Sequence, residues 1–195
     1  MALQRSILHP DLIRSVVAQY PLSTRGAYGP AHWFRVREIG LRLAAETGAS
    51  RTVVELFALF HDARRYNEHR DHDHGSRGAD LALQYQQQGQ LLVSEEEMEL
   101  LQAACIDHTH GGIEGDITVQ TCWDADRLDL GRVGIRPRAD KLCTDVARAP
   151  ETIAWAYEQS QRWLEKYLSN PENRRRYEAH KRTCPNHKRQ PHHHD

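Results

Sequence analysis

Histidine and aspartate residues occur at spacings that could bring them together around a divalent cation. A His-Asp doublet, His61-Asp62, closes the most hydrophobic segment of the chain, VVELFALFH. His32, His108 and Asp126 follow the apolar positions of three other segments. Burying imidazole or carboxylate groups without partners is costly, and a cation that they share removes that cost. The pattern therefore predicts a metal site at the centre of a bundle, where several helices converge.

The segments that carry these residues have patterns typical of helices. Residues 30–47 begin with a proline in first-turn position and end before Gly48, and Val36, Ile39 and Leu43 are spaced three and four apart between them. Residues 51–65 contain VVELFALFH, which is apolar nearly all round and predicts a central helix that is buried from several sides.

The rest of the chain also favours helices. Ser94 and Glu97 form a predicted capping box ahead of MELLQAACIDH, which ends before two glycines. The stretch TVQTCWDADRLDLGRVG predicts a helix that ends at Gly131 or Gly134, and ETIAWAYEQSQRWLEKYL predicts an amphipathic helix that covers the core. No segment shows sustained alternation of apolar and polar residues, so the predicted fold class is all-α.

We expect one compact multi-helix domain over residues 5–168 and a polar extension over residues 169–195. The extension opens with Asn170-Pro171, a good start for a short surface helix, and we expect a disordered end after that helix. Residues 192–194 are three consecutive histidines in this tail and are not among the predicted metal ligands.

Composition limits the classes of function. The chain has 195 residues, a net charge of −1 and a mean hydropathy of −0.75. These values argue against a membrane protein and against nucleic acid as a bulk partner. The chain shows no signal-peptide pattern, and its cysteines are widely scattered, so we expect a cytoplasmic protein with reduced thiols. No heptad repeat or clear apolar stripe indicates an oligomeric state. The cysteines, expected in the core, are Cys105, Cys122, Cys143 and Cys184.

The order of the candidate ligands resembles a known signature. His32, then His61-Asp62 in FALFHDARR, then Asp126 in WDADRLDLG, is similar to the H…HD…D pattern of the HD superfamily of metal-dependent phosphohydrolases. The resemblance covers about residues 28–145 and implies that these four residues bind one ion. Asp124 is the alternative to Asp126.

Two further histidines resemble the elements that bind a second ion in part of that superfamily. His74 stands in HGSRGADLA and His108 in IDHTHGG, and the resemblance implies that Asp62 bridges the two ions. The nitrogen and oxygen ligands suit one or two divalent transition-metal ions, Mn, Fe, Co, Ni or Zn, better than Ca. The neighbouring alternatives to these histidines are His69, His72 and His110.

Arginines stand where the nucleotide monophosphatases of the superfamily carry a glutamate. Arg65 follows the doublet closely, and a guanidinium there suits the capture of phosphate oxygens. We therefore predict that Asp62 and Arg65 are catalytic. An equally simple interpretation is that the two arginines complement a helix dipole. The predicted substrate-binding residues are Arg64, Arg65, Arg127 and Lys141, and Arg77 is a weaker candidate.

The resemblance implies a metal-dependent phosphohydrolase that cleaves a phosphate mono- or diester of a nucleotide or small phosphorylated metabolite through a metal-activated hydroxide. Cyclic dinucleotides are not the first expected substrate, because the Gly-Tyr-Pro motif of the cyclic-dinucleotide phosphodiesterases of the superfamily is absent. One alternative is a di-iron oxygenase, similar to myo-inositol oxygenase, that cleaves a C–C or C–P bond with Tyr28 as a lid. The other is a regulatory protein whose metal site only binds a ligand.

Overall fold

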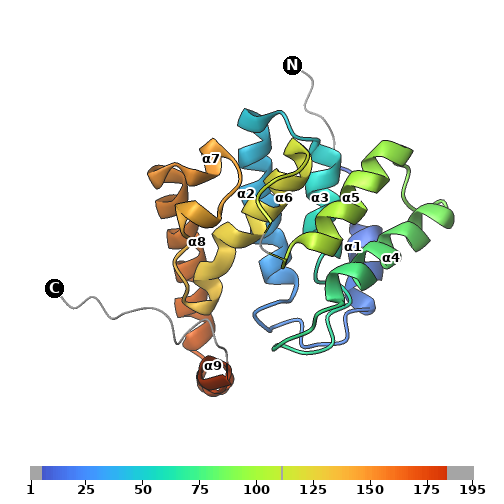
Figure 1. Ribbon diagram of the computed structural model, residues 1–195. Coiled ribbons are helices and arrows are strands. Elements are labelled where there is room, and N and C mark those ends of the chain that lie inside the picture. Colours follow the sequence, from blue (N-terminus) through green and yellow to red (C-terminus); the bar gives the residue numbers. More distant parts are fainter. Residues whose placement is uncertain (1–5, 111, 184–195) are drawn as a thin grey trace.

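The computed structural model describes residues 6–110 and 112–183, and every regular element within those ranges is a helix (Figure 1). The predicted all-α fold class is confirmed. The α-helices are α1 (Pro10–Ala18), α2 (Pro30–Thr47), α3 (Arg51–Phe60), α4 (His74–Gln87), α5 (Glu95–Asp107), α6 (Ile117–Leu128), α7 (Asp145–Arg148), α8 (Pro150–Leu168) and α9 (Pro171–Thr183), and the 3₁₀ helices are η1 (Asp129–Val133) and η2 (Ala139–Lys141).

Helix α3 forms the centre of the core, as its all-round apolar pattern predicts. All its residues from Val53 to Phe60 are buried, and α2, α5 and α6 pack against it. The predicted extent of this helix was wrong, because it ends at Phe60 rather than at residue 65. The amides of Ala63 and Arg65 donate to carbonyls only three residues earlier, so the chain turns here. This turn carries His61 and Asp62.

Several other helix ends follow the predicted signals. Helix α2 begins at Pro30 and ends just before Gly48, whose φ of 76° is left-handed. The capping box of α5 is present with both of its hydrogen bonds. After α6, η1 continues to Gly134, which also has a left-handed φ, of 77°. These ends set where the ligand-bearing segments start and stop.

The C-terminal helices lie on one side of the bundle. Helix α8 packs along η1, and α9 lies against α8 at the lower left of Figure 1. Helix α9 stands where a short helix was predicted. The remainder of the predicted extension, residues 184–195 with Cys184 and the three consecutive histidines, lies outside the described residues. The other three cysteines are free and buried, as predicted.

The tryptophans are used for packing. Trp33 and Trp123 are buried in the core. Trp155 and Trp163 are half-buried, and the guanidinium carbons of Arg42 and Arg35 lie 4.2 and 4.4 Å from the centres of their rings.

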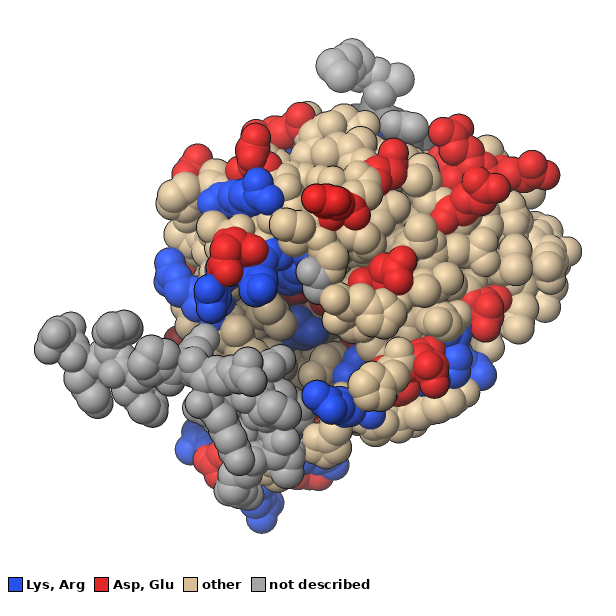
Figure 2. All heavy atoms as spheres, viewed as in Figure 1, with Lys and Arg blue, Asp and Glu red and all other residues tan. Residues whose placement is uncertain are grey.

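One face of the described surface has a group of acidic side chains without basic neighbours. Figure 2 shows this group at the upper right, where α5 begins with three glutamates, whereas Arg and Lys side chains on the left and lower parts of the face are mixed with acidic ones. None of the helices in the described ranges is long and apolar enough to cross a membrane.

Candidate metal centre

The first candidate ligand group joins three segments at the middle of the bundle. His32 comes from the first turn of α2, His61 from the turn after α3, and Asp126 from α6. The Nε2 atoms of His32 and His61 are 3.0 Å apart, and His32 Nε2 is 3.2 Å from Asp126 Oδ1. Both imidazoles are fully buried, and the Asp126 side chain is 16% exposed. The predicted residues of the first ion therefore meet at one point.

The second group lies beside the first. It consists of Asp62 from the turn after α3, His74 at the start of α4 and His108 just after α5, all buried. His74 Nε2 is 3.0 Å from His108 Nε2 and 3.2 Å from Asp62 Oδ1. The structure thus places His74 and His108 in the group, whereas the competing His69, His72 and His110 are exposed.

Asp62 connects the two groups. Its Oδ2 lies 3.6 Å from His32 Nε2 and 3.7 Å from His61 Nε2. Its Oδ1 faces the other way, towards His74 Nε2. One carboxylate oxygen is therefore directed at each group, which is the arrangement that a bridging ligand requires.

Each of the four imidazoles is oriented by its other nitrogen. The Nδ1–H groups of His61, His74 and His108 donate to the backbone carbonyls of Phe57, Asp71 and Cys105, respectively. Carbonyls only accept, so Nδ1 carries the proton and the Nε2 lone pair points into the site. His32 Nδ1 donates in the same way, 2.7 Å from a carboxylate oxygen of Asp129.

The orientation of the imidazole rings shows whether a metal ion fits between their Nε2 atoms. In each group, two Nε2 atoms lie 3.0 Å apart. If both rings are neutral, both atoms are acceptors with no proton between them, which is unfavourable unless a cation accepts both lone pairs. The donor set of imidazole nitrogen and carboxylate oxygen suits a divalent transition metal. The residues therefore fit the predicted metal.

The electrostatics favour the protonation states that bind metals. Burial lowers the pKa of His61 to about 3 and also lowers the pKa of His108. Burial alone would raise the pKa of Asp62, but the neighbouring His61, His74 and Arg65 hold it well below its usual value. The pKa of Asp126 is lowered too, because hydrogen bonding to His32 and the charge of Arg132 outweigh burial. Neutral imidazoles and ionised carboxylates are the forms that bind metals.

Sequence reasoning missed Asp129, which supports the first group from behind. Its carboxylate is fully buried and accepts from His32 Nδ1 at 2.7 Å, from Arg35 Nε at 2.7 Å and Nη2 at 2.9 Å, and from Ser160 Oγ at 2.7 Å. Carboxylates that bind the outer nitrogen of a ligand histidine fix its tautomer and raise its basicity. The signal in the sequence was the position of Asp129, three residues after Asp126 in DADRLD.

Asp124, the alternative to Asp126, lies in neither ligand group. It is buried and accepts hydrogen bonds from the Cys143 amide at 2.7 Å and from the Thr144 amide and hydroxyl at 2.8 Å each. This carboxylate therefore holds the loop that leads into α7.

Arg65 lies inside the centre, whereas Arg64 is only half-buried. Arg65 is buried, and its Nη1 is 3.3 Å from Asp62 Oδ1. Arg64 is half-buried, and its carbonyl accepts a hydrogen bond from Arg77 Nε. Arg77 also forms an ion pair with Asp71.

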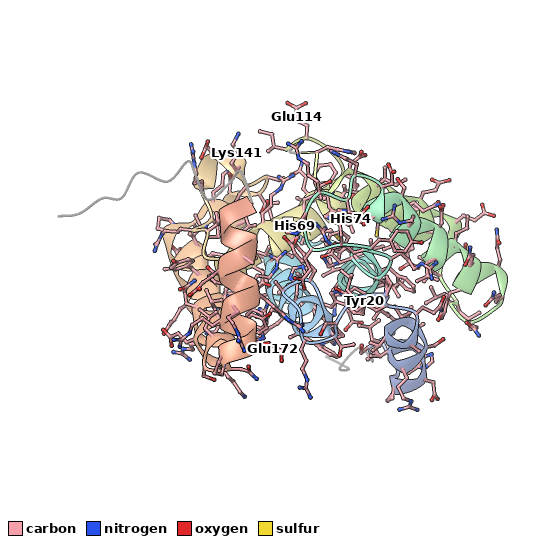
Figure 3. The ribbon with its side chains drawn as sticks, turned by 90° about the horizontal axis from the view of Figure 1, so that it is seen from below. Tyr20, His69, His74, Glu114, Lys141 and Glu172 are labelled. Atoms are coloured by element: carbon pink, nitrogen blue, oxygen red, sulfur yellow. The ribbon has the colours of Figure 1, made fainter. Side chains whose placement is uncertain are left out.

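The other two predicted substrate-binding residues lie at the ends of helices, Arg127 in the last turn of α6 and Lys141 at the end of η2. Arg127 donates to the carbonyls of Gly112 at 2.7 Å and Lys141 at 3.0 Å, and to Cys143 Sγ at 3.3 Å. The Lys141 side chain is exposed, and Figure 3 shows it at the upper edge of the molecule, with His74 nearer the middle.

A second buried arginine, Arg132, was also missed. Its Nη2 lies 3.8 Å from Asp126 Oδ1, and its guanidinium carbon is 5.2 Å from the centre of the Tyr28 ring. The guanidinium carbon of Arg65 is 4.0 Å from the same ring centre. Tyr28 thus contacts two buried cations that reach the carboxylates of the two groups.

The bundle has paired histidine and aspartate groups at its centre that could hold metal ions. A family model described as HD domain matches residues 31–142, which is more than half of the chain and includes all six candidate ligands. The chain therefore belongs to the HD family, as the resemblance implied.

A solved structure has the same fold. The chain is similar to the crystal structure of a predicted HD superfamily hydrolase from an uncultured Thermotogales bacterium, with a TM-score of 0.58 and 21% sequence identity. The match covers 83% of this chain and 92% of that chain. At this identity the likeness concerns the fold. None of the curated proteins compared with the chain matches it.

Proposed function

We propose that this protein is a metal-dependent hydrolase that cleaves a phosphate mono- or diester of a nucleotide or other small metabolite. Its HD family membership and its two buried ligand groups support a metal-dependent hydrolase in general. The observation that carries the proposal is the position of Asp62, with one carboxylate oxygen directed at each group. Two ions held in this way are typical of sites for displacement at phosphorus.

Within this proposal, the ligands hold one or two divalent transition-metal ions. When bound, such ions lower the pKa of water and neutralise phosphoryl oxygens. The chain's own contribution begins with Asp129 and the three backbone carbonyls, which keep the imidazoles turned towards the ions.

The buried guanidinium groups provide the positive charge that a phosphoryl group needs. Arg65 reaches Asp62 and Arg132 lies near Asp126, so both cations lie at the ligand groups. Guanidinium groups recognise phosphate oxygens and stabilise the negative charge of the transition state. We assign phosphoryl binding to Arg65, and contact with the more distant part of the substrate to the half-buried Arg64.

The test is hydrolysis by purified protein loaded with Mn²⁺, Co²⁺ or Ni²⁺, assayed on aryl phosphates and a panel of nucleotides. Turnover is expected, and Asp62→Ala is expected to abolish it because this change removes the carboxylate that both groups share. Asp80→Ala is the matched control, since Asp80 is exposed on α4.

Failure of this proposal has distinct signatures. Full metal loading without turnover on any ester would contradict it. Iron content with substrate-dependent oxygen uptake would indicate the oxygenase alternative. A ligand-induced rise in melting temperature without turnover would indicate a regulatory protein.

A further inference from the structure

The guanidinium of Arg65 lies within the second ligand group. Its Nη1 is 3.1 Å from His74 Nε2 and 3.3 Å from Asp62 Oδ1. Because His74 Nδ1–H donates to the Asp71 carbonyl, the Nε2 lone pair accepts from Arg65. This is the same lone pair that a metal ion would use.

Arg65 is fixed in this position from several sides. Its Nε donates to the Asn67 carbonyl at 2.9 Å, and its Nη2 donates to the His69 carbonyl at 2.7 Å. The face of the guanidinium lies against the Tyr28 ring. An arginine remains charged at any physiological pH. The second group therefore contains a permanent cation that is held by the loop after the doublet.

The first group has no equivalent contact. Its nearest guanidinium, Arg132, lies 3.8 Å from a carboxylate oxygen of Asp126 and is not hydrogen-bonded to His32 or His61 among the contacts of the described residues. The first group also has a carboxylate of its own, whereas the second group has only its share of Asp62. The two groups therefore differ in both negative charge and competing positive charge.

We propose that Arg65 competes with the metal ion in the second group, so that the two sites fill with unequal affinity. A second ion must displace the hydrogen bond to His74 and approach a fixed positive charge at short range. The first ion has no such hydrogen bond to displace, and its neighbouring guanidinium, Arg132, lies 3.8 Å from a carboxylate oxygen of Asp126 rather than on a ligand nitrogen. This proposal goes beyond the hydrolase assignment, because it concerns metal affinity and holds for any substrate.

The experiment is a calorimetric titration of the metal-free, full-length protein with Mn²⁺. The wild-type protein is expected to bind one ion tightly and a second about 10- to 100-fold more weakly, the range over which residues around a ligand shell change metal affinity. Arg65→Gln removes the charge but keeps an amide donor for the loop carbonyls. It is expected to strengthen the second binding event by about 10- to 100-fold and to leave the first unchanged.

Three further variants complete the design. Arg65→Lys keeps the positive charge and is expected to keep the wild-type difference in affinity. Arg70→Gln removes an exposed arginine from the same loop and serves as the matched control. Arg65→Met is a second neutral variant that replaces Arg65→Gln if the latter does not fold. Retention of the tight first ion reports folding in every variant.

Two equally tight ions in the wild-type protein would overturn the proposal. So would an unchanged second affinity in a neutral variant that retains the first ion, or a lysine variant that behaves like the neutral ones. The metal titration does not depend on ester hydrolysis. A protein without hydrolase activity would still show or lack the expected difference in metal affinity, so the two proposals fail independently.

Discussion

The Nδ1–H of His32 donates to a carboxylate oxygen of Asp129 over 2.7 Å, while the Nε2 of the same ring faces the first ligand group. The contact joins α2 to η1, and both side chains are fully buried. Asp129 also pairs with Arg35 through two hydrogen bonds. One carboxylate therefore fixes the tautomer of a ligand and neutralises a half-buried cation.

Replacing Asp129 is expected to weaken both metal binding and folding. An asparagine in this position can donate to His32 Nδ1 and stabilise the wrong tautomer, which should lower the affinity for the first ion about 10- to 100-fold. Leaving the half-buried Arg35 without its carboxylate should cost about 1.5–3 kcal/mol of stability. Titration calorimetry and urea unfolding measure the two effects. Asp140→Asn, at an exposed ion pair with Arg138, should change neither, and unaltered metal affinity in Asp129→Asn would refute the positioning role.

The metal-free protein is expected to lose stability as the pH falls below 6.5, the ordinary pKa of histidine. Burial lowers the pKa of His61 to about 3, so between these values the unfolded chain takes up a proton that the folded chain does not. Protonation then favours unfolding, at about 1.4 kcal/mol per pH unit for this group. The lowered pKa values of Asp62 and Asp126 act in the same direction at lower pH.

Urea unfolding of the metal-free protein at pH 7, 6 and 5 measures this dependence. His61→Gln should reduce the slope, because glutamine does not titrate. A stability that stays constant over this range would show that His61 is protonated in the folded state as well.

Substitution of Gly75 is expected to separate the two histidines of the second group. A Cβ at this position would overlap the Cys105 carbonyl oxygen and lie 3.2 Å from His108 Nδ1, so α4 would have to move away from α5. Gly75→Ala should therefore weaken the second ion and cost about 1–3 kcal/mol of stability. Gly112→Ala is the control, since its Cβ would come no closer than 3.7 Å to Trp123. Equal stability of the two variants would contradict the close approach of the helices.

Removing the Arg127 side chain is expected to lower the stability of the fold more than it lowers catalytic activity. Its hydrogen bonds to the carbonyls of Gly112 and Lys141 connect the end of α6 to the segment before α6 and to η2, and each is worth about 0.5–1.5 kcal/mol. Arg127→Gln should lower the free energy of unfolding by about 1–3 kcal/mol. Thermal unfolding measures this change. A rise in KM at unchanged stability would instead place Arg127 in contact with the substrate.

The sequence was sufficient to predict the fold class, most helix ends and all six members of the two groups. The helical pattern and the capping residues are local signals, and His61 and Asp62 stand out because they end the most apolar segment of the chain. The predicted helix over residues 51–65 extended too far because no glycine or proline marks its end at Phe60.

Long-range contacts account for what the sequence did not predict. Asp129 meets His32 across 97 positions of the chain, and Arg132 lies near the Tyr28 ring across a similar interval. Arg127 and Lys141 were selected for their charge, but partners in distant loops decide what such residues do. The resemblance favoured His74 and His108 over the neighbouring histidines, and burial in the folded chain separates them from those exposed alternatives.

The six side chains of the two groups are spread from residue 32 to residue 126, on segments that meet only when the bundle is complete. During synthesis, the nascent chain therefore cannot bind a metal ion with its complete set of ligands until Asp126 has left the ribosome. Metal uptake should be one of the last events in maturation, and a protein truncated before α6 should emerge without its first ion.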